Sequence, residues 1–375
     1  MTTGIRILES LATIEPADWD ALAGGNPTLA HAYLTALHES GSAVPRRGWS
    51  PRYLALYEGG MLAGAVPLYA KAHSYGEYVF DWAWAEAHER HGIAYYPKLL
   101  AAVPFTPVPG ARLLARDDAA RAKLAQALVA LARESGVSSL HVLFPDEADG
   151  AALRGAGLSE RTGVQFHWAN AGYRDFEDFL AAMSHDKRKK IRQERRRVRD
   201  AGVVLRRLSG RDAVEADWDF FFECYRGTYR AHRSTPYLTR DFFRRLAATM
   251  PEALLLVIAG QAGEPVAAAM GLAGGGRLLG RYWGATRFVP GLHFEACYYQ
   301  FVEHAIERGI AVVEGGAQGE HKHARGFSPV LTRSFHWLAH PAFASAVDDF
   351  LAREGAGLSA YVDELSERSP FRRGG

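Results

Sequence analysis

Residues 314–327 combine glycine with reactive side chains at a density that packing alone does not require. The stretch reads EGGAQGEHKHARGF, and its four glycines let the backbone approach a ligand and present amide groups to an oxyanion. Its carboxylate and histidines can accept a proton, and its lysine and arginine can hold an anion. Loops this rich in both glycine and titratable groups are seldom purely structural. We therefore predict that the stretch lines a functional site, the alternative being a solvated charged turn.

Two neighbouring segments add polar and aromatic groups to this predicted site. Arg281, Tyr282 and Trp283 end an expected strand, and residues 293–295 open the expected helix that follows. We expect the three strand residues to bind substrate together with Gln318 of the glycine-rich stretch.

A second candidate segment lies in the first half of the chain, between residues 80 and 109. Aromatic side chains with polar tips at the end of a strand suit a cleft wall that binds a polar ligand. The alternative is an aromatic core beside a solvated loop. The residues that we predict to contact substrate are Asp81, Trp82, Trp84, Tyr95, Tyr96 and Lys98.

The positive charge of the chain is concentrated in residues 186–200, which read DKRKKIRQERRRVRD. The segment holds nine Lys/Arg and three acids, or +6, whereas the rest has 35 basic and 39 acidic residues, or −4. Its composition favours a helix. A thin apolar stripe of Phe179, Met183, Ile191 and Val198 is expected to face the body of the protein. The basic faces predict either a solvated linker or a docking surface for phosphates of a cofactor, an RNA or an anionic lipid, with Arg188 and Arg192 among the binding residues.

Composition excludes several classes of protein. A length of 375 residues predicts about two domains, and a net charge of +2 excludes a general nucleic-acid coat. Two cysteines are too few for a disulfide framework or a structural zinc site, and His321 and His323 lack a third metal ligand at recognisable spacing, so we expect no metal. The longest apolar run, residues 253–259, is too short to cross a bilayer. We expect a cytoplasmic protein.

Hydrophobic periodicity predicts the same order of elements in both halves: a strand, one or two helices, three antiparallel strands, a helix, a strand, a short segment and a last strand. Residues 75–84 are expected to form the third strand of the first half. This order indicates an α+β protein with mixed, mainly antiparallel sheets. The predicted N-terminal domain covers residues 1–170 and the basic linker helix 171–202. The C-terminal domain covers 203–366 and a flexible tail 367–375.

The element order resembles the acyltransferase fold of the GNAT superfamily, present twice. The motifs HFEACYYQ at 293–300, GAQGEHK at 316–322 and ARGF at 324–327 are similar to bacterial predicted N-acyltransferases of the Fem-like, tandem-GNAT kind. In the first half, FDW at 80–82, YYPK at 95–98 and PFTP at 104–107 carry the same resemblance. The resemblance implies an N-acyltransferase that moves an acyl group from acyl-CoA, such as acetyl-CoA, to an amine of a small molecule or peptide.

Such a transfer needs a base for the amine, a donor to the oxyanion, and groups that hold the carrier's phosphates. The candidate bases are Glu320 and Glu295, with His321 and His293 as rivals. The backbone amides of 315–319, with Tyr298 or Tyr282, are candidates for the oxyanion. The candidates for holding the carrier are Gly315, Gly316, Gly319, Lys322 and Arg325.

The broader Fem relatives transfer amino acids from aminoacyl-tRNA to the peptide of a cell-wall precursor, and residues 187–203 are similar to their basic helix. The resemblance therefore also implies a tRNA, or an anionic lipid-linked precursor, as a partner at this helix. The chain departs from the acetyl-CoA pyrophosphate motif, because Pro290 stands where the first glycine belongs and removes an amide. It also lacks the long helical arm of Fem enzymes. An inactive GNAT pair that serves as a binding module is a further alternative, and it predicts that the site residues lie apart or in internal ion pairs. The enzyme hypotheses place the site between the halves.

Overall fold

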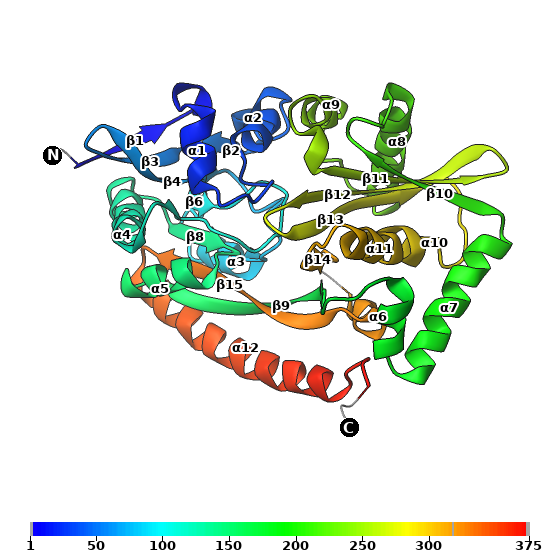
Figure 1. Ribbon diagram of the computed structural model, residues 1–375. Helices are drawn as coiled ribbons and strands as arrows, with labels where there is room; N and C mark the ends of the chain where they lie inside the picture. Colours follow the sequence, from blue (N-terminus) through cyan, green and yellow to red (C-terminus); the bar gives the residue numbers. More distant parts are fainter. Residues whose placement is uncertain (1–2, 317–318, 373–375) are drawn as a thin grey trace. The chain divides into compact units, whose positions relative to one another are not determined.

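The computed structural model describes residues 3–316 and 319–372, which form two compact units (Figure 1). The first unit comprises the described residues of 1–164 and 331–361, and the second those of 165–330 and 362–375. The boundaries therefore differ from those expected, since residues 331–361 return to the first unit. Strand β15 (Ser328–Leu338) explains this return, because it pairs antiparallel with β8 (Ser139–Leu143) from Ser334↔Leu143 to Leu338↔Ser139.

The first unit contains two groups of strands. Strand β1 (Thr3–Leu8), β3 (Tyr53–Glu58), β4 (Met61–Val66) and β7 (Leu114–Ala115) form an antiparallel sheet in the order β1-β3-β4-β7. The second group has the order β15-β8-β6-β5-β2, with β6 (Lys98–Ala101), β5 (Leu68–Lys71) and β2 (Trp49–Pro51). Its one parallel pair is β6 with β8. The helices are α1 (Pro16–Leu22), α2 (His31–Glu39), α3 (Trp82–Arg90), α4 (Asp118–Glu134), α5 (Glu147–Gly155) and most of α12 (Pro341–Glu367).

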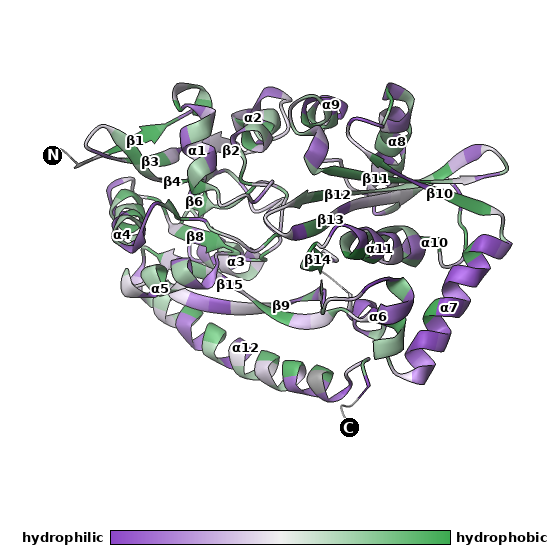
Figure 2. Ribbon diagram, in the orientation of Figure 1, coloured by the Kyte–Doolittle hydropathy of each residue, from purple (hydrophilic) through white to green (hydrophobic). Residues whose placement is uncertain are grey.

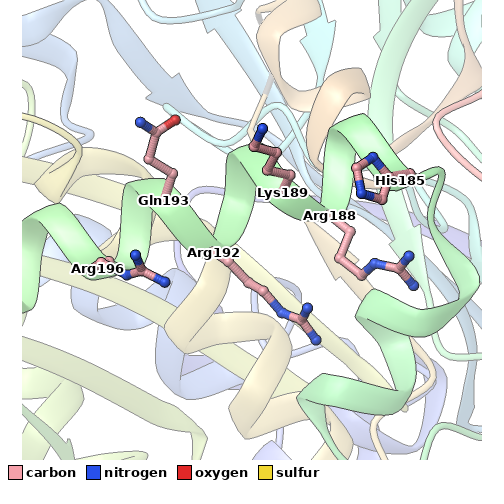
Figure 3. A pocket seen from close by; sticks show the side chains of 6 residues that line it. All are labelled: His185, Arg188, Lys189, Arg192, Gln193 and Arg196. Carbon is pink, nitrogen blue, oxygen red and sulfur yellow. The ribbon is translucent and has the colours of Figure 1, made fainter.

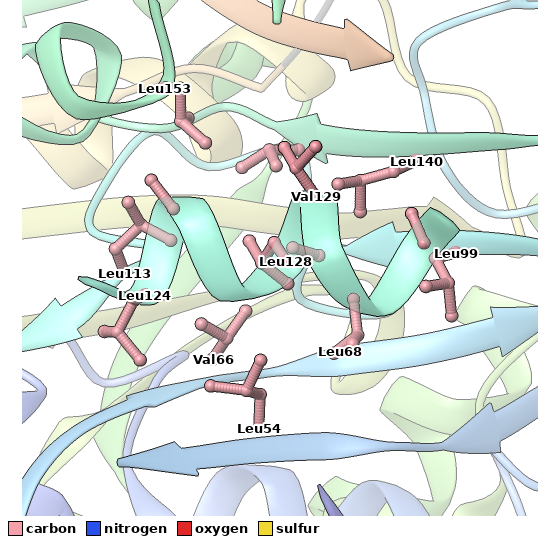
Figure 4. Close-up of a cluster of buried hydrophobic side chains, with 14 of the residues drawn as sticks. Leu54, Val66, Leu68, Leu99, Leu113, Leu124, Leu128, Val129, Leu140 and Leu153 are labelled. Atoms are coloured by element: carbon pink, nitrogen blue, oxygen red, sulfur yellow. The ribbon is translucent and has the colours of Figure 1, made fainter. Parts of the chain in front are cut away.

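The core of this unit is built around α4, as the leucine spacing predicts. Asp117 caps the helix by accepting a hydrogen bond from the Ala120 amide. Leu124 and Leu128 point from one face into a cluster of strand side chains (Figure 4). Burial of each such leucine contributes about 1.5–3 kcal/mol. The cluster includes Leu54, Val66, Leu68, Leu99 and Leu140.

The second unit contains one mixed sheet in the order β10-β11-β12-β13-β14-β9. Its strands are β10 (Val203–Ser209), β11 (Leu254–Gln261), β12 (Glu264–Gly274), β13 (Arg277–Ala285), β14 (Val312–Glu314) and the end of β9 (Ser159–Ala169). Only the β13–β14 pair is parallel in this series. The helices are α6 (Phe176–Ala182), α7 (His185–Asp200), α8 (Glu215–Ala231), α9 (Arg240–Thr249), α10 (Leu292–Phe294) and α11 (Gln300–Glu307). The predicted α+β class with mixed, mainly antiparallel sheets is confirmed in both units.

The expected strand at residues 75–84 is absent from the structure, and Trp82 begins α3 instead. Gly76 and Tyr78 both adopt positive φ angles, of 83° and 65°, which interrupt an extended chain. The segment turns because Glu77 and Asp81 point inward to the buried Lys98. A long-range ion pair has therefore overridden the local aromatic pattern that predicted the strand.

The basic segment forms helix α7, and its predicted apolar stripe is confirmed. Phe179, Met183, Ile191 and Val198 are all buried, but Phe179 lies in α6 and Met183 ends it, so the single helix expected over 171–202 is two helices. Apart from Ile191 and Val198, α7 is strongly hydrophilic (Figure 2). Residues 367–372, expected to be a flexible tail, hydrogen-bond to the segment before α7 through Ser184 with Pro370 and Arg372 with Ala182. Residues 373–375 of that tail lie outside the described residues. No helix in the described part of the chain is both long and apolar enough to span a bilayer.

Candidate functional site

Three residues predicted to do chemistry come together in the second unit, and we call them the His321 site: His293, Tyr298 and His321. The Tyr298 hydroxyl and the His321 Nε2 share a hydrogen bond of 3.0 Å. The ring of His293 lies 5.4 Å from that of Tyr298 and 6.2 Å from that of His321. Lys322 follows His321 in the 3-10 helix η5 (Glu320–Arg325). Two residues of one helical segment, His293 and Tyr298, thus form one cluster with His321, which lies 23 positions after Tyr298.

A π-helical turn, η4 (Glu295–Tyr299), decides which residues reach the His321 site. It interrupts the helix between α10 and α11, and such bulges often mark functional sites. A π-helical turn contains one more residue than an α-helical turn. In this turn Tyr298 lies beside His321, whereas Glu295 points to Arg195 of α7. Glu295 is 3% exposed and also accepts a hydrogen bond from Gln300. The Glu295 carboxylate is therefore held by Arg195 and Gln300, and it does not lie in the His321 site as the predicted base would.

Electrostatics keep the histidines of this site neutral at neutral pH. Partial burial, with the charges of Lys322 and Arg325, lowers the pKa of His321. Burial and the same neighbours lower the pKa of His293 to about 4. Burial also lowers the pKa of Lys322 to about 8, and its ammonium donates to the Gly316 carbonyl oxygen over 2.8 Å. A neutral, exposed His321 is able to accept a proton at pH 7.

The glycines of the predicted site make room for its side chains. Gly319 has a φ of 111°, and a Cβ on it would fall 2.3 Å from the Cε1 atom of His321. A Cβ on Gly315 would lie 3.0 Å from the Lys322 Cδ atom. The Gly315 amide is already bonded to the Phe166 carbonyl oxygen. These glycines therefore let the side chains of His321 and Lys322 pack directly against the backbone, a role that the sequence did not suggest.

Arg325, expected to hold a carrier phosphate, is instead buried in an internal ion pair. Its guanidinium binds the Glu194 carboxylate with two hydrogen bonds, of 2.7 and 3.2 Å, and lies 3.4 Å from the centroid of the Phe294 ring. Glu194 was not predicted. Its position between Ile191 and Val198, on the inward stripe of α7, is the sequence signal that marks it as buried.

The other predicted residues of the second half occupy different surroundings. Trp283 lies 5.4 Å from the His293 ring and extends the His321 site. Tyr282 packs against Tyr225 and Phe243, and the Arg281 guanidinium lies over the Tyr282 ring. Glu320 is exposed at the start of η5. Gln318 lies outside the described residues.

The predicted residues of the first half form a buried ionic network, which we call the Lys98 cluster: Ser74, Glu77, Asp81, Tyr95 and Lys98. The Lys98 ammonium donates to Ser74 and Glu77 over 2.8 Å each and also to Asp81. Tyr95 donates to Asp81 over 2.6 Å. Burial opposes both charges, yet the mutual attraction raises the pKa of Lys98 and lowers that of Asp81. The groups that saturate Lys98 thus come from its own unit.

The aromatic residues of the same segment divide between core and surface. Trp84 is buried against His336, with ring centroids 4.9 Å apart, and Tyr96 shares a hydrogen bond of 2.8 Å with Ser74. Trp82 is 40% exposed and packs against the exposed Tyr75. Of the predicted first-half residues, Trp82 is therefore the one whose ring is most available to a ligand.

A buried histidine pair next to the Lys98 cluster leads to a stability prediction. The Nδ1 atoms of His141 and His336 are 2.7 Å apart, and burial, supported by the Lys98 charge, lowers the pKa of His141 to about 3. Burial and His141 also lower the pKa of His336. Below about pH 6.5 these two histidines are protonated in the unfolded chain and stay neutral in the native state. The free energy of unfolding should therefore fall by about 1.4 kcal/mol for each histidine with each unit by which the pH is lowered.

Urea unfolding between pH 7.5 and pH 5 measures this slope. In His336→Leu the slope of the free energy of unfolding against pH should decrease by about 1.4 kcal/mol per pH unit, which corresponds to one proton. Replacement of the exposed His232 by Gln should leave the slope unchanged. An identical slope in wild type and His336→Leu would contradict the assignment.

The outward face of α7 carries basic side chains around a hollow of about 420 Å³ (Figure 3). We call this group of side chains the α7 stripe: His185, Arg188, Lys189, Arg192 and Arg196, with Gln193 among them. Arg192 pairs with the exposed Glu177. Seven other cations of α7 make no ion pair within residues 3–316 and 319–372, namely Lys187, Arg188, Lys189, Lys190, Arg196, Arg197 and Arg199. Their mutual repulsion favours an anionic partner.

A comparison with protein families gives one match that covers nearly the whole chain. The FemAB-like family model, described as peptidoglycan biosynthesis/recognition, matches residues 10–373. No curated protein sequence matches. Within the described residues no group of three or more His, Cys, Asp or Glu side chains is arranged to hold a metal ion.

Solved structures with the same fold are distant in sequence. One is the C-terminal domain of a putative lysylphosphatidylglycerol synthetase from Agrobacterium fabrum, with a TM-score of 0.57, 10% identity, and coverage of 90% of this chain and 95% of the other. FemX aligns with a TM-score of 0.56, 11% identity, and coverage of 93% and 100%. L-PGS from Bacillus licheniformis gives 0.55, 12%, and coverage of 90% and 97%.

Proposed function

Because this chain belongs to the FemAB-like family of GNAT-fold transferases, we propose that it transfers an aminoacyl group from aminoacyl-tRNA to an amine of a peptidoglycan precursor. The observation that carries the proposal is the hydrogen-bonded Tyr298–His321 pair beside Lys322. Aminoacyl-tRNA occurs inside the cell, so the proposed donor places the reaction in the cytoplasm.

The proposed step assigns one role to each member of the pair. The acceptor amine attacks the carbonyl carbon of the aminoacyl ester, a C–N bond forms, and the C–O bond to the tRNA ribose breaks. With its proton on Nε2, His321 donates to the Tyr298 oxygen and takes the amine proton on Nδ1. The Tyr298 hydroxyl is then free to donate to the oxyanion. His321 returns the proton to the departing ribose oxygen.

Two features favour an aminoacyl-tRNA donor over acyl-CoA. The loop before α10, where GNAT enzymes bind pyrophosphate, carries Pro290 and packs against α7: a Cβ on Gly291 would lie 3.5 Å from the Glu194 carbonyl oxygen. Val289 and Leu292 share a core cluster with Val198, so α7 covers the start of α10. In contrast, the α7 stripe supplies cations for several phosphates, as an RNA backbone requires.

The names of proteins with this fold also support the proposal. One of them is a putative lysylphosphatidylglycerol synthetase, a name that denotes an aminoacylated product. Lys322, with its ammonium at the Gly316 carbonyl, is proposed to attract the anionic end of the donor to the His321 site.

The test is a transfer assay with the full chain and a nucleotide-linked muropeptide as acceptor. Donors are a mixture of radiolabelled aminoacyl-tRNAs and, separately, acetyl-CoA. We expect label on the peptide amine with aminoacyl-tRNA only, and a loss of about 100-fold in kcat for Tyr298→Phe, the usual effect of removing one oxyanion donor. The matched control is Tyr237→Phe. Turnover with acetyl-CoA alone would overturn the choice of donor, and transfer that is unchanged in Tyr298→Phe would overturn the site.

A further inference from the structure

Glu194 is an acid buried on the inward face of the most basic helix of the protein. It is 9% exposed, and its neighbours on the same face, Ile191 and Val198, are 1% and 0% exposed. A carboxylate in such a place needs charged or hydrogen-bonding partners to offset its loss of solvent. The sequence offers nine cations on α7 itself, yet Glu194 pairs with none of them.

The partners of Glu194 come from two other elements. Arg325 of η5 binds it with both Nε and Nη2, at 3.2 and 2.7 Å, and the Tyr299 hydroxyl of the π-helical turn donates to its Oε2 atom. Arg325 is itself 4% exposed. Two parallel hydrogen bonds between a guanidinium and a carboxylate fix orientation as well as distance.

The third hydrogen bond of Arg325 leads to the His321 site. Its Nη1 atom donates to the carbonyl oxygen of His321 over 2.6 Å. The ring of Phe294 packs against the same guanidinium. A continuous chain of contacts therefore runs from Glu194 on α7, through Arg325, to the backbone of His321.

The η5 segment has little rigidity of its own. It is six residues long and lies between Gly319 and Gly326, with φ angles of 111° and 88°. Two 3-10 turns between two glycines need tertiary contacts to hold one conformation. His321 is exposed at this turn, and two contacts hold it: Arg325 donates to its backbone carbonyl oxygen, and its imidazole is hydrogen-bonded to Tyr298.

We infer that Glu194 is a positioning residue for His321 and acts through Arg325. The inference rests on the proposed function for its catalytic consequence. Its structural content, that Glu194 holds η5, stands independently of the reaction. Helix α7 then has two tasks: its outward face carries the α7 stripe, and its inward face holds the turn that bears the proposed base.

The neighbouring ion pair provides a matched control. Arg195 is the next residue of α7 and binds Glu295 and Glu303 through four hydrogen bonds of 3.0 to 3.1 Å. Glu194→Gln removes one charge of α7 and takes the carboxylate away from Arg325, and Arg195→Met removes one charge and takes the guanidinium away from Glu295 and Glu303. Only the first of them removes the ion pair that holds Arg325 against α7 and, through Arg325, the backbone of His321.

Hydrogen exchange of the full-length chain tests the clamp without any substrate. In Glu194→Gln we expect the amides of residues 321–326 to exchange at least 10-fold faster than in wild type, while Arg195→Met leaves their exchange unchanged. Equal acceleration in both variants would mean general destabilisation and would overturn the inference. Unchanged exchange in Glu194→Gln would overturn it as well.

Kinetics test the consequence for catalysis. With kcat measured in the transfer assay, Glu194→Gln should lose about 100-fold, the effect of displacing a reacting group by about 1 Å, with KM for the donor changed by less than about 3-fold. Glu194→Asp should recover part of the loss. A fall of kcat in Arg195→Met as large as in Glu194→Gln would overturn the positioning role. Absence of transfer in the wild type would overturn the proposed function alone, since the exchange experiment still decides whether Glu194 holds η5.

Discussion

Replacing His321 by Asn should lower kcat about 1,000-fold, while the affinity for both substrates changes little. The size of the effect is the middle of the range for loss of a general base. Asn has no ring nitrogen to accept the amine proton, and its amide reaches only as far as the histidine Nδ1 atom, so the hydrogen bond that His321 makes to Tyr298 through Nε2 is lost as well. The measurement is single-turnover transfer of the labelled aminoacyl group with saturating acceptor.

The pH profile of the wild type follows from the same assignment. A base must be neutral to act, and burial with the charges of Lys322 and Arg325 lowers the pKa of His321 below its usual value of 6.5. The acidic limb of kcat should therefore lie below pH 6.5, with full activity at neutral pH. In His321→Asn this limb should disappear.

Glu320 is the rival base and gives the decisive control. It adjoins His321 and is exposed, and Glu320→Gln should retain activity within about 10-fold of wild type. A larger loss in Glu320→Gln than in His321→Asn would transfer the role of base to the carboxylate.

Removing the α7 stripe should weaken RNA binding about 200-fold at 0.15 M salt. The variant changes Arg188, Lys189, Arg192 and Arg196 to Gln. Each phosphate contact to a single strand contributes ~0.7 to the slope of log affinity against log salt, so four contacts reduce the slope by about 3. At 0.15 M salt, the loss of four contacts lowers the affinity for RNA by a factor of about 10 to the power 2.3, or about 200. Two exposed acids lie at the stripe: Glu177 pairs with Arg192, and Asp186 lies beside His185.

The binding experiment uses uncharged tRNA and fluorescence anisotropy at several salt concentrations. A control with equal charge changes four exposed arginines elsewhere, Arg226, Arg230, Arg233 and Arg353, to Gln. We expect its affinity to fall by less than about 5-fold. If both quadruple variants lose the same affinity, net charge and not the stripe is responsible. If the stripe variant loses binding to anionic vesicles and keeps binding to tRNA, the partner of α7 is a lipid surface.

The choice between an enzyme and a binding module depends on which of the predicted site residues are bound in ion pairs inside the protein. Asp81, Lys98, Glu295 and Arg325 are bound in ion pairs of their own unit, as the binding-module alternative expected. His321, exposed and bonded to Tyr298, differs from them. Membership of a transferase family and this pair together favour the enzyme.

Local patterns in the sequence determined much of the protein. The spacing of apolar residues placed α4, α8 and most strands of the second unit, because amphipathic periodicity reflects which face of an element is buried. The charge run placed α7, and the four apolar residues near it identified its inward face. The density of glycine and titratable groups marked the segment that bears His321.

Tertiary structure decided the rest, because ion pairs and strand pairing join residues that are far apart in sequence. Lys98 turned Glu77 and Asp81 inward and removed a predicted strand, and β15 paired with β8 across some 190 positions to return the chain to the first unit. The π-helical turn moved Glu295 away from the His321 site and brought Tyr298 into it. Arg325 and His321 are four residues apart on one short turn, yet one is buried against Glu194 and the other is exposed, since the contacts around each side chain, and not its type, settle whether it holds the fold or does chemistry.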